Sequence, residues 1–443
     1  MTDKGDDDFR AVPSGRAARL GQFGGLAAGV VGNMIGEGAK RFARGERPKA
    51  RDLLLTPGNA KRVADRLSHL RGAAMKMGQM ISMDAGDILP AELSAILARL
   101  REQATRMPPT QLNEVLKREW GENWRRRFKR FEPTPVAAAS IGQVHRAEMP
   151  DGRKIAVKVQ YPGVAGSIDS DVDNVAGLLK LSGALPKSID LAPLLAEAKI
   201  QLQQEADYVR EGAHLAAYKE RLAGDERYIV PGLVEELTTP QVLAMDWIDG
   251  VPVEKLMDEP QEQRDRVTSE LIELVLRELF EFGVMQTDPN FANYRYQPDT
   301  GRLVLLDFGA TRDIPPAIAD DYAIILRALW SGNVDEVRDA ALAAGYINVA
   351  AVERHRERID RMICVILGQL ASPGDFDFGD RAFVGELRAQ GMAIAEDREA
   401  WHIPPVDTIF IQRKISGTAL LAANLKARVA IGDIVQTALT RRD

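Results

Sequence analysis

Residues 285–311 read MQTDPNFANYRYQPDTGRLVLLDFGAT, and two patterns in this stretch decide the interpretation of the chain. Asp288 and Asn293 form D-x-x-x-x-N, and Asp307-Phe308-Gly309 follows a short apolar run that predicts a buried strand. Turn residues at 298–301 predict a hairpin between the two patterns. In phosphoryl transfer from ATP, one carboxylate orients the attacking hydroxyl or water, while an amide oxygen and a second carboxylate hold Mg²⁺. Either pattern alone could arise by chance, but the pair at this spacing predicts a phosphotransfer site.

The composition is that of an ordinary globular chain: 443 residues, 45% hydrophobic and 28% charged, with a formal net charge of −6. The acidic balance argues against a general nucleic-acid binder. The single cysteine, Cys364, excludes an intrachain disulfide framework and is expected to be a packed thiol, because it lies in an apolar run. We find no secretory signal and no uninterrupted apolar stretch of about 18 residues, so we predict no spanning helix.

The first 52 residues are predicted to form a flexible leader. Residues 21–36 are small and apolar, and a cluster of cations follows: Lys40, Arg41, Arg44, Arg47, Lys49 and Arg51. An apolar segment beside clustered cations is typical of an element that binds the surface of an anionic membrane. A solvated leader without membrane affinity is the alternative.

Residues 53–130 are predicted to form a helical extension. Within it, residues 59–83 show apolar positions at three- and four-residue steps, which indicates an amphipathic helix. Lys76 and Gln79 lie three residues apart, so both project from one face of this helix.

Residues 131–250 switch to the two-residue period of strands. Asp151-Gly152 predicts a hairpin turn, and the next strand carries Lys158 between Ala156 and Gln160 on one face. A lysine flanked by small residues in an apolar strand requires an anionic partner. The alternative is a solvated lysine on an edge strand.

A single long helix is predicted over residues 191–223. On it, Asp207 and Glu211 are four residues apart and share a face, and Lys158 and Lys76 are the candidate cations for its acidic residues. A later strand ends at a glycine-containing linker, where backbone groups of Asp246, Trp247 and Ile248 are predicted to contact adenine. Residues 251–443 are predicted to be largely helical apart from the hairpin of the candidate site.

The motifs and their order along the chain resemble those of the UbiB/ADCK (AarF-type) atypical kinase family of ubiquinone biosynthesis. The resemblance is strongest to the mitochondrial-type members and their bacterial relatives. The residues that carry the resemblance are Lys76-Met77-Gly78-Gln79 (K-x-G-Q), Ala137-Ala138-Ala139-Ser140 (A-A-A-S), Glu205-Ala206-Asp207 (E-x-D), Gln286-Thr287-Asp288-Pro289-Asn290 with Asn293, and Asp307-Phe308-Gly309.

The resemblance implies an α+β fold, namely a two-lobed protein-kinase-like domain with an N-terminal helical extension and a largely helical C-terminal lobe. It implies that Lys158 pairs with Glu211 and contacts the phosphates, that Asp288 is the catalytic-loop carboxylate, and that Asn293 and Asp307 bind magnesium. Lys76 and Gln79 would belong to the catalytic set, with Lys76 meeting Glu205 and Asp207. Alanine does not reach positive φ as glycine does, so the alanine-rich loop at 137–140 should restrain the nucleotide.

The family also implies an activity, namely a Mg-dependent ATPase or small-molecule kinase that supports ubiquinone (coenzyme Q) biosynthesis at a membrane. Gln286-Thr287 replaces the usual His-Arg, and no Ala-Pro-Glu follows Asp307, which argues against a conventional protein kinase. The expected ligands and partners are ATP or ADP, Mg²⁺, quinone-biosynthesis proteins and anionic lipids, with a homodimer as a further option. The expected location is cytoplasmic, peripheral to the inner membrane. The alternative is a nucleotide-binding pseudokinase scaffold without chemistry.

Overall fold

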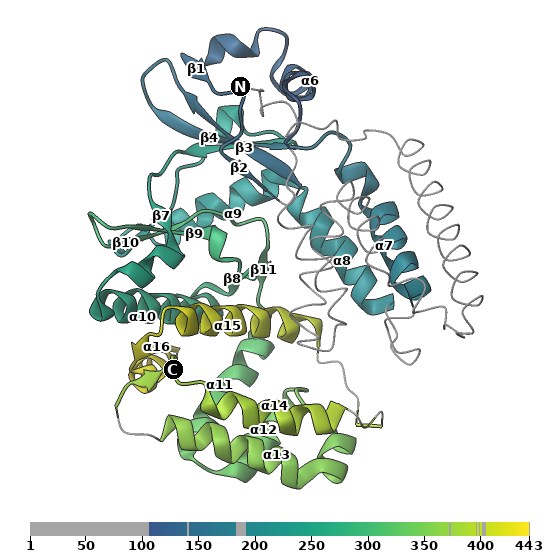
Figure 1. Ribbon diagram of the computed structural model, residues 1–443, viewed down its shortest axis with the longest axis vertical. Helices are drawn as coiled ribbons and strands as arrows, with labels where there is room; N and C mark the ends of the chain where they lie inside the picture. Colours follow the sequence, from purple (N-terminus) through teal and green to yellow (C-terminus); the bar gives the residue numbers. More distant parts are fainter. Residues whose placement is uncertain are drawn as a thin grey trace, which may run out of the picture. The chain divides into compact units, whose positions relative to one another are not determined.

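The computed structural model describes residues 106–139, 141–182, 192–371, 374–395, 397, 399–400 and 405–442 (Figure 1). The predicted leader, the helix predicted to carry Lys76 and Gln79, and Ser140 lie outside these residues. The chain divides into two compact units. The first extends through Ala216 and includes Pro231–Trp247, and the second comprises Ala217–Val230 and Ile248–Asp443.

The first unit is built on an antiparallel five-stranded sheet in the order β1-β3-β4-β6, with β2 pairing β3. Its strands are β1 (Arg130–Phe131), β2 (Ala137–Ala138), β3 (Gly142–Glu148), β4 (Lys154–Gln160) and β6 (Val242–Asp246). The predicted turn between β3 and β4 is confirmed, with Gly152 at φ 88°. Because β4 pairs with β3 on one side and β6 on the other, it is an internal strand. The alternative prediction, a solvated lysine on an edge strand, is wrong.

One face of this sheet is covered by α6 (Pro109–Trp120) and an aromatic cluster. The apolar positions of α6 recur at helical spacing, and Leu112, Leu116 and Trp120 are buried. Trp120 packs with its ring centroid 5.4 Å from that of Phe128, and its indole N–H donates to the Leu237 carbonyl at 3.0 Å. These rings share a buried core with the apolar residues of β4, so α6 and its aromatic cluster hold in place the strand that carries Lys158.

Three helices follow β4: α7 (Ile168–Ser182), α8 (Ala192–Glu205) and α9 (Tyr208–Arg221). α7 and α8 pack against each other (Figure 1). The prediction of one helix over residues 191–223 is wrong, because the helix breaks at Ala206-Asp207. The Asp207 carboxylate accepts a hydrogen bond from the Arg210 backbone N–H at 3.0 Å and so caps α9. Asp207 therefore precedes α9 and does not share a helix face with Glu211.

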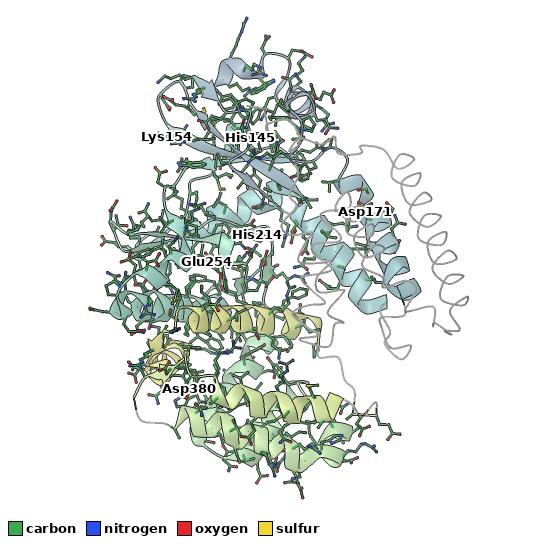
Figure 2. All side chains as sticks on the ribbon, viewed as in Figure 1. His145, Lys154, Asp171, His214, Glu254 and Asp380 are labelled. Atoms are coloured by element: carbon green, nitrogen blue, oxygen red, sulfur yellow. The ribbon has the colours of Figure 1, made fainter. Side chains whose placement is uncertain are left out.

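His145 lies on β3, as labelled in Figure 2. It belongs to a chain of buried polar contacts. The His145 Nδ1–H donates to the Glu132 carbonyl at 2.9 Å, so its Nε2 accepts from the Gln143 side-chain amide at 2.8 Å. The Gln143 Oε1 in turn accepts from the Met107 backbone N–H at 2.9 Å. Burial lowers the pKa of His145 to about 4, and the hydrogen bond to Glu132 acts in the opposite direction.

This lowered pKa predicts acid-sensitive stability of the first unit. As the pH falls below the ordinary histidine value of 6.5, the unfolded chain binds a proton before the folded chain does, so the free energy of unfolding decreases until the pH reaches about 4. Between pH 6.5 and 5 we expect a loss of about 2 kcal/mol. Denaturant unfolding followed by tryptophan fluorescence checks this, and His145→Gln should flatten the dependence. An unchanged slope in that variant would contradict the assignment.

The second unit contains a four-stranded sheet in the order β5-β10-β9-β7 and a separate pair, β8 with β11. Its strands are β5 (Tyr228–Ile229), β7 (Val251–Pro252), β8 (Val284–Gln286), β9 (Tyr294–Gln297), β10 (Arg302–Leu305) and β11 (Thr311–Asp313). β9 and β10 form the predicted hairpin, with Leu305 opposite Tyr294. β5 pairs with β10 in parallel, which the sequence analysis did not anticipate.

Helices make up most of the rest of this unit. They are α10 (Gln261–Arg277), α11 (Pro316–Ser331), α12 (Val334–Ala343), α13 (Val349–Leu370), α14 (Ala382–Ala395), α15 (Val406–Asn424) and α16 (Ile431–Arg442), with the short pair β12 (Phe376–Asp377) and β13 (Arg428–Val429). α10 continues into a π-helical turn, Glu278–Phe282, which leads directly to β8. The helical C-terminal part was therefore correctly predicted.

Cys364 is exposed on α13, so the prediction of a packed thiol is wrong: the apolar run that contains it also faces outward at this position. In the portion of the chain that the structure describes, no helix combines the length and the apolar character needed to cross a membrane.

Candidate active site

Lys158 is the central charged group of the first unit. Its ammonium donates to both carboxylate oxygens of Glu211, at 2.9 and 3.0 Å, and both side chains are buried. The Lys158 Nζ also lies 5.1 Å from the centroid of the Tyr208 ring. The anionic partner predicted for this strand lysine is thus Glu211, on α9. A lysine held at fixed distance by a buried carboxylate can present its charge to a phosphate.

The alanine-rich segment lies next to β3 in the same unit. Ala137 and Ala138 form β2, and the Ala139 N–H donates to the Gly142 carbonyl at 2.8 Å. None of these three alanines has positive φ. Gly142 itself is tightly enclosed, because a Cβ there would overlap the Val159 carbonyl and lie 2.9 Å from the Tyr208 hydroxyl.

The remaining acidic and linker residues predicted for the first unit occupy different environments. Glu205 is buried at the end of α8. The Asp246 carboxylate accepts from the Gly232 N–H at 2.8 Å, and the Trp247 N–H donates to the Lys154 carbonyl at 3.0 Å. The linker between β6 and β7 begins at Trp247, and Ile248 already belongs to the second unit.

The D-x-x-x-x-N segment of the second unit forms the loop between β8 and β9. The Asn290 side chain accepts from the Ala292 N–H at 3.1 Å and begins a short 3₁₀ helix, Phe291–Asn293. Asn293 is buried, and its amide nitrogen donates to the Asp288 backbone carbonyl at 3.3 Å. This contact joins the two ends of the motif. It uses the nitrogen of the Asn293 side-chain amide and leaves the side-chain oxygen Oδ1 turned away from the Asp288 backbone carbonyl.

Asp307 follows β10 directly, as the buried apolar run predicted. Its Oδ1 accepts from the Gly309 N–H at 3.0 Å, which closes a tight turn around Phe308. The Leu306 N–H donates to the Asn293 backbone carbonyl at 3.0 Å. Asn293 and Asp307 both line one small cavity. The structure therefore brings together the two residues predicted to bind magnesium.

These residues fit a magnesium ion. Mg²⁺ is usually held by one or two carboxylates and neutral oxygen ligands together with substrate phosphates and waters. Asp307 offers a carboxylate, and the Asn293 amide offers its oxygen because its nitrogen is engaged with Asp288.

Helix α15 contributes residues that the sequence analysis missed. Lys414 donates to the Gln286 side chain at 3.2 Å and to the Tyr294 hydroxyl at 2.7 Å, on either side of the loop that contains D-x-x-x-x-N. The sequence does contain a sign of this role, because Lys414 lies on the apolar face of a helix between Ile411 and Leu421, which are both buried.

Gly417 of α15 also lies against the loop that contains D-x-x-x-x-N. A Cβ at this position would overlap the Cβ of Pro289, the residue after Asp288, and lie 2.7 Å from its Cγ. We expect Gly417→Ala to lower the free energy of unfolding by about 1–3 kcal/mol, because the proline ring cannot move aside. Gly391→Ala in α14 is the matched control, since nothing lies within 4 Å of its added Cβ. Denaturant unfolding should show the control at or above wild-type stability, and equal values for the two variants would contradict the close contact.

Residues 99–341 match the model of the ABC1 atypical kinase-like domain. The chain belongs to this family. The atypical kinase COQ8B of Rattus norvegicus, a mitochondrial protein, is 38% identical over 436 residues, which cover 96% of this chain and 81% of the rat protein. The mitochondrial atypical kinase COQ8 of Saccharomyces cerevisiae is 36% identical over 430 residues, covering 95% and 84% of the two chains.

A solved structure extends the similarity to the fold. The complex of Rv3197 with erythromycin from Mycobacterium tuberculosis matches with a TM-score of 0.61 and 29% identity, covering 85% of this chain and 94% of that chain. The family membership and this match confirm the expected UbiB/ADCK resemblance and the α+β kinase-like fold, with a strand-rich N-terminal unit and a largely helical C-terminal unit.

Proposed function

We propose that this ABC1-family chain is a Mg-dependent ATPase or small-molecule kinase that supports ubiquinone biosynthesis. The observation that carries the proposal is the buried Lys158–Glu211 ion pair. A pseudokinase scaffold that binds nucleotide without chemistry has no need of the complete set of proposed catalytic groups, namely Lys158, Asp288, Asn293 and Asp307. The relatives named as atypical kinases support the same class of activity.

In the proposed reaction, the ammonium of Lys158 contacts the α and β phosphates of ATP, and Glu211 fixes its position. The Asp288 carboxylate accepts a hydrogen bond from the attacking water or hydroxyl and takes its proton as the new P–O bond forms at the γ phosphate. The bond from the γ phosphorus to the β-γ bridging oxygen breaks, and ADP leaves. Asn293 and Asp307 would hold a magnesium ion, which would supply positive charge to the phosphates when bound.

Several predicted contacts remain part of this proposal. Ala137, Ala138, Ala139 and Ser140 restrain the phosphates, and backbone groups of Asp246, Trp247 and Ile248 bind adenine. Lys76 and Gln79 belong to the proposed catalytic set. Glu205 and Asp207 are the proposed anionic partners of Lys76. We further propose a peripheral location at the inner membrane, with the cationic leader on anionic lipid.

Phosphate release from the purified full chain tests the proposed function. Mg-ATP is supplied alone, with anionic liposomes, and with liposomes plus a quinone-precursor phenol. We expect turnover that requires Mg²⁺ and increases with the lipid or phenol. Nucleotide binding without turnover in all three conditions would instead support the pseudokinase scaffold.

A further inference from the structure

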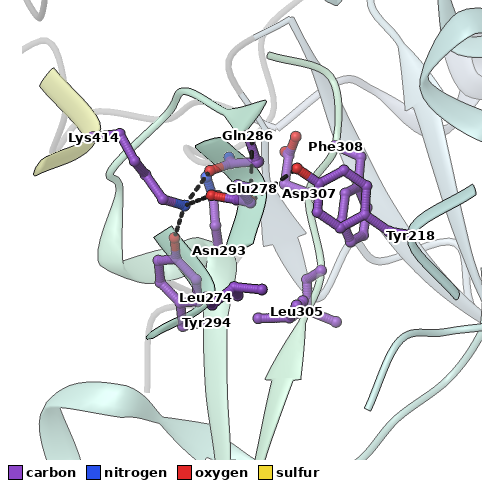
Figure 3. Close-up of a pocket in the computed structure, with 11 residues that line it drawn as sticks. Tyr218, Leu274, Glu278, Gln286, Asn293, Tyr294, Leu305, Asp307, Phe308 and Lys414 are labelled. Atoms are coloured by element: carbon purple, nitrogen blue, oxygen red, sulfur yellow. Dashed lines mark hydrogen bonds and ion pairs between the residues drawn. The ribbon is translucent and has the colours of Figure 1, made fainter. Parts of the chain in front are cut away.

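A cluster of buried polar side chains lies beneath the candidate catalytic loop of the second unit (Figure 3). Lys414 lies 3.5 Å from the Glu278 carboxylate and donates to Gln286 and Tyr294. Glu278 also accepts from the Tyr218 hydroxyl at 2.8 Å and from the Gln286 backbone N–H at 3.3 Å. Five residues from α9, the π-helical turn, β8, β9 and α15 thus share one network.

The network contains a buried opposite-charge pair. Burial raises the pKa of Glu278, an effect that Lys414 opposes. Burial disfavours the Lys414 ammonium, but Glu278 and Tyr294 outweigh this and raise the pKa of Lys414. Replacing a buried ion pair with apolar residues often leaves stability unchanged or increases it. Stability alone therefore does not account for this pair, and its contacts indicate a geometric role.

Those contacts reach the two segments of the second unit that carry Asp288, Asn293 and Asp307. Gln286 and Tyr294 bracket the loop with Asp288 and Asn293. The Tyr218 ring lies 4.7 Å, centroid to centroid, from Phe308, the neighbour of Asp307. A π-helical turn, which carries Glu278, is uncommon and occurs frequently at functional sites.

A cavity of about 10 Å³ adjoins the network and is lined by Glu278, Gln286, Asn293 and Asp307. This is about the smallest volume that holds one water molecule. The Gln286 Nε2 is buried without a hydrogen-bond partner from the described residues, and the Glu278 Oε2 has the Lys414 ammonium at 3.5 Å but accepts no hydrogen bond of good geometry from them. A water in this cavity that accepted from Gln286 and donated to Glu278 would satisfy both atoms, and it would lie beside Asn293 and Asp307, which line the same cavity.

We propose that Lys414 is a positioning residue, which holds the catalytic loop and the magnesium ligands in place through Gln286, Tyr294 and one ordered water in this cavity. Lys414 contacts no reacting atom in this proposal. The inference rests on the proposed phosphotransfer function for its catalytic consequence, but the ordering of residues 284–297 can be measured without nucleotide.

The test compares two variants of the full chain with wild type. Lys414→Met leaves the Glu278 carboxylate buried without its cation and should lower the melting temperature. The double variant Lys414→Met with Glu278→Gln removes both charges and keeps the acceptor for Tyr218, so its melting temperature should recover. Amide hydrogen exchange over residues 284–297 should nevertheless remain faster than in wild type, and kcat should stay lower by roughly 10–100-fold, the usual cost of small misplacement.

Arg338→Met is the matched control. Arg338 of α12 is an equally buried cation, paired with Asp360 of α13, and it does not line the cavity. This variant should lower the melting temperature without accelerating exchange over 284–297. Recovery of both exchange and kcat in the double variant would overturn the positioning role. If wild-type protein shows no Mg-ATP turnover, the proposed function fails, and the exchange comparison still decides whether Lys414 orders the loop.

Discussion

Asp288→Asn is expected to lower phosphate release from Mg-ATP by roughly 10²–10⁴-fold, the range typical of a lost general base. The amide retains the size and hydrogen-bonding reach of the carboxylate but no longer accepts the proton of the nucleophile. Nucleotide affinity should stay near wild type, because Lys158, Asn293 and Asp307 are unchanged. Phosphate release and nucleotide titration, measured on the same preparation, check both parts.

Asp299→Asn provides the matched control for this variant, since Asp299 is an exposed carboxylate in the turn between β9 and β10. The control should turn over at the wild-type rate. If Asp288→Asn also did so, Asp288 would not be the catalytic carboxylate.

Asp307→Asn is expected to weaken Mg-dependent nucleotide binding by at least roughly 10–100-fold, the loss typical of even an outer-shell partner of a metal ligand. Mg²⁺ loses a hard anionic ligand, whereas the remaining side-chain oxygen can still accept from the Gly309 N–H. The local turn should therefore persist, and the effect should be confined to Mg-nucleotide.

The measurement is the thermal shift of each protein in ATP with and without Mg²⁺. Asp313→Asn, at an exposed position on β11, is the control and should respond as wild type does. Equal Mg-ATP shifts for Asp307→Asn and wild type would remove Asp307 from the proposed magnesium site.

Local patterns predicted the parts of the candidate site that depend on nearby sequence. The turn residues at 298–301 and the apolar run before Asp307 predicted the β9–β10 hairpin. The alternation around Lys158 predicted a strand lysine with an anionic partner, but the pairing of β4 on both sides and the burial of Lys158 came from the structure. The pairing of Lys158 with Glu211 across 53 residues came from the family resemblance. The spacing of residues within each motif did not specify a partner 53 residues further along the chain.

Other features depend on contacts that a one-dimensional pattern does not contain. The break at Ala206-Asp207 has no proline or glycine to mark it, and is visible only from the Asp207 cap on α9. The exposure of Cys364 depends on which face of α13 packs against its neighbours. The Lys414 network joins residues more than a hundred positions apart, so its members read in sequence as unrelated polar side chains.

The division of the chain into two discontinuous units has a consequence for folding during synthesis. The chain leaves the first unit at Ala216 and returns to it only for Pro231–Trp247. β6, which lies in that returning segment, is the neighbour of β4 opposite β3. Until Val242–Asp246 has emerged from the ribosome, β4 and its Lys158 remain on an unprotected sheet edge, a template for pairing with other chains. Nascent chains that stop before β6 should therefore depend on chaperones, and those that extend beyond it should not.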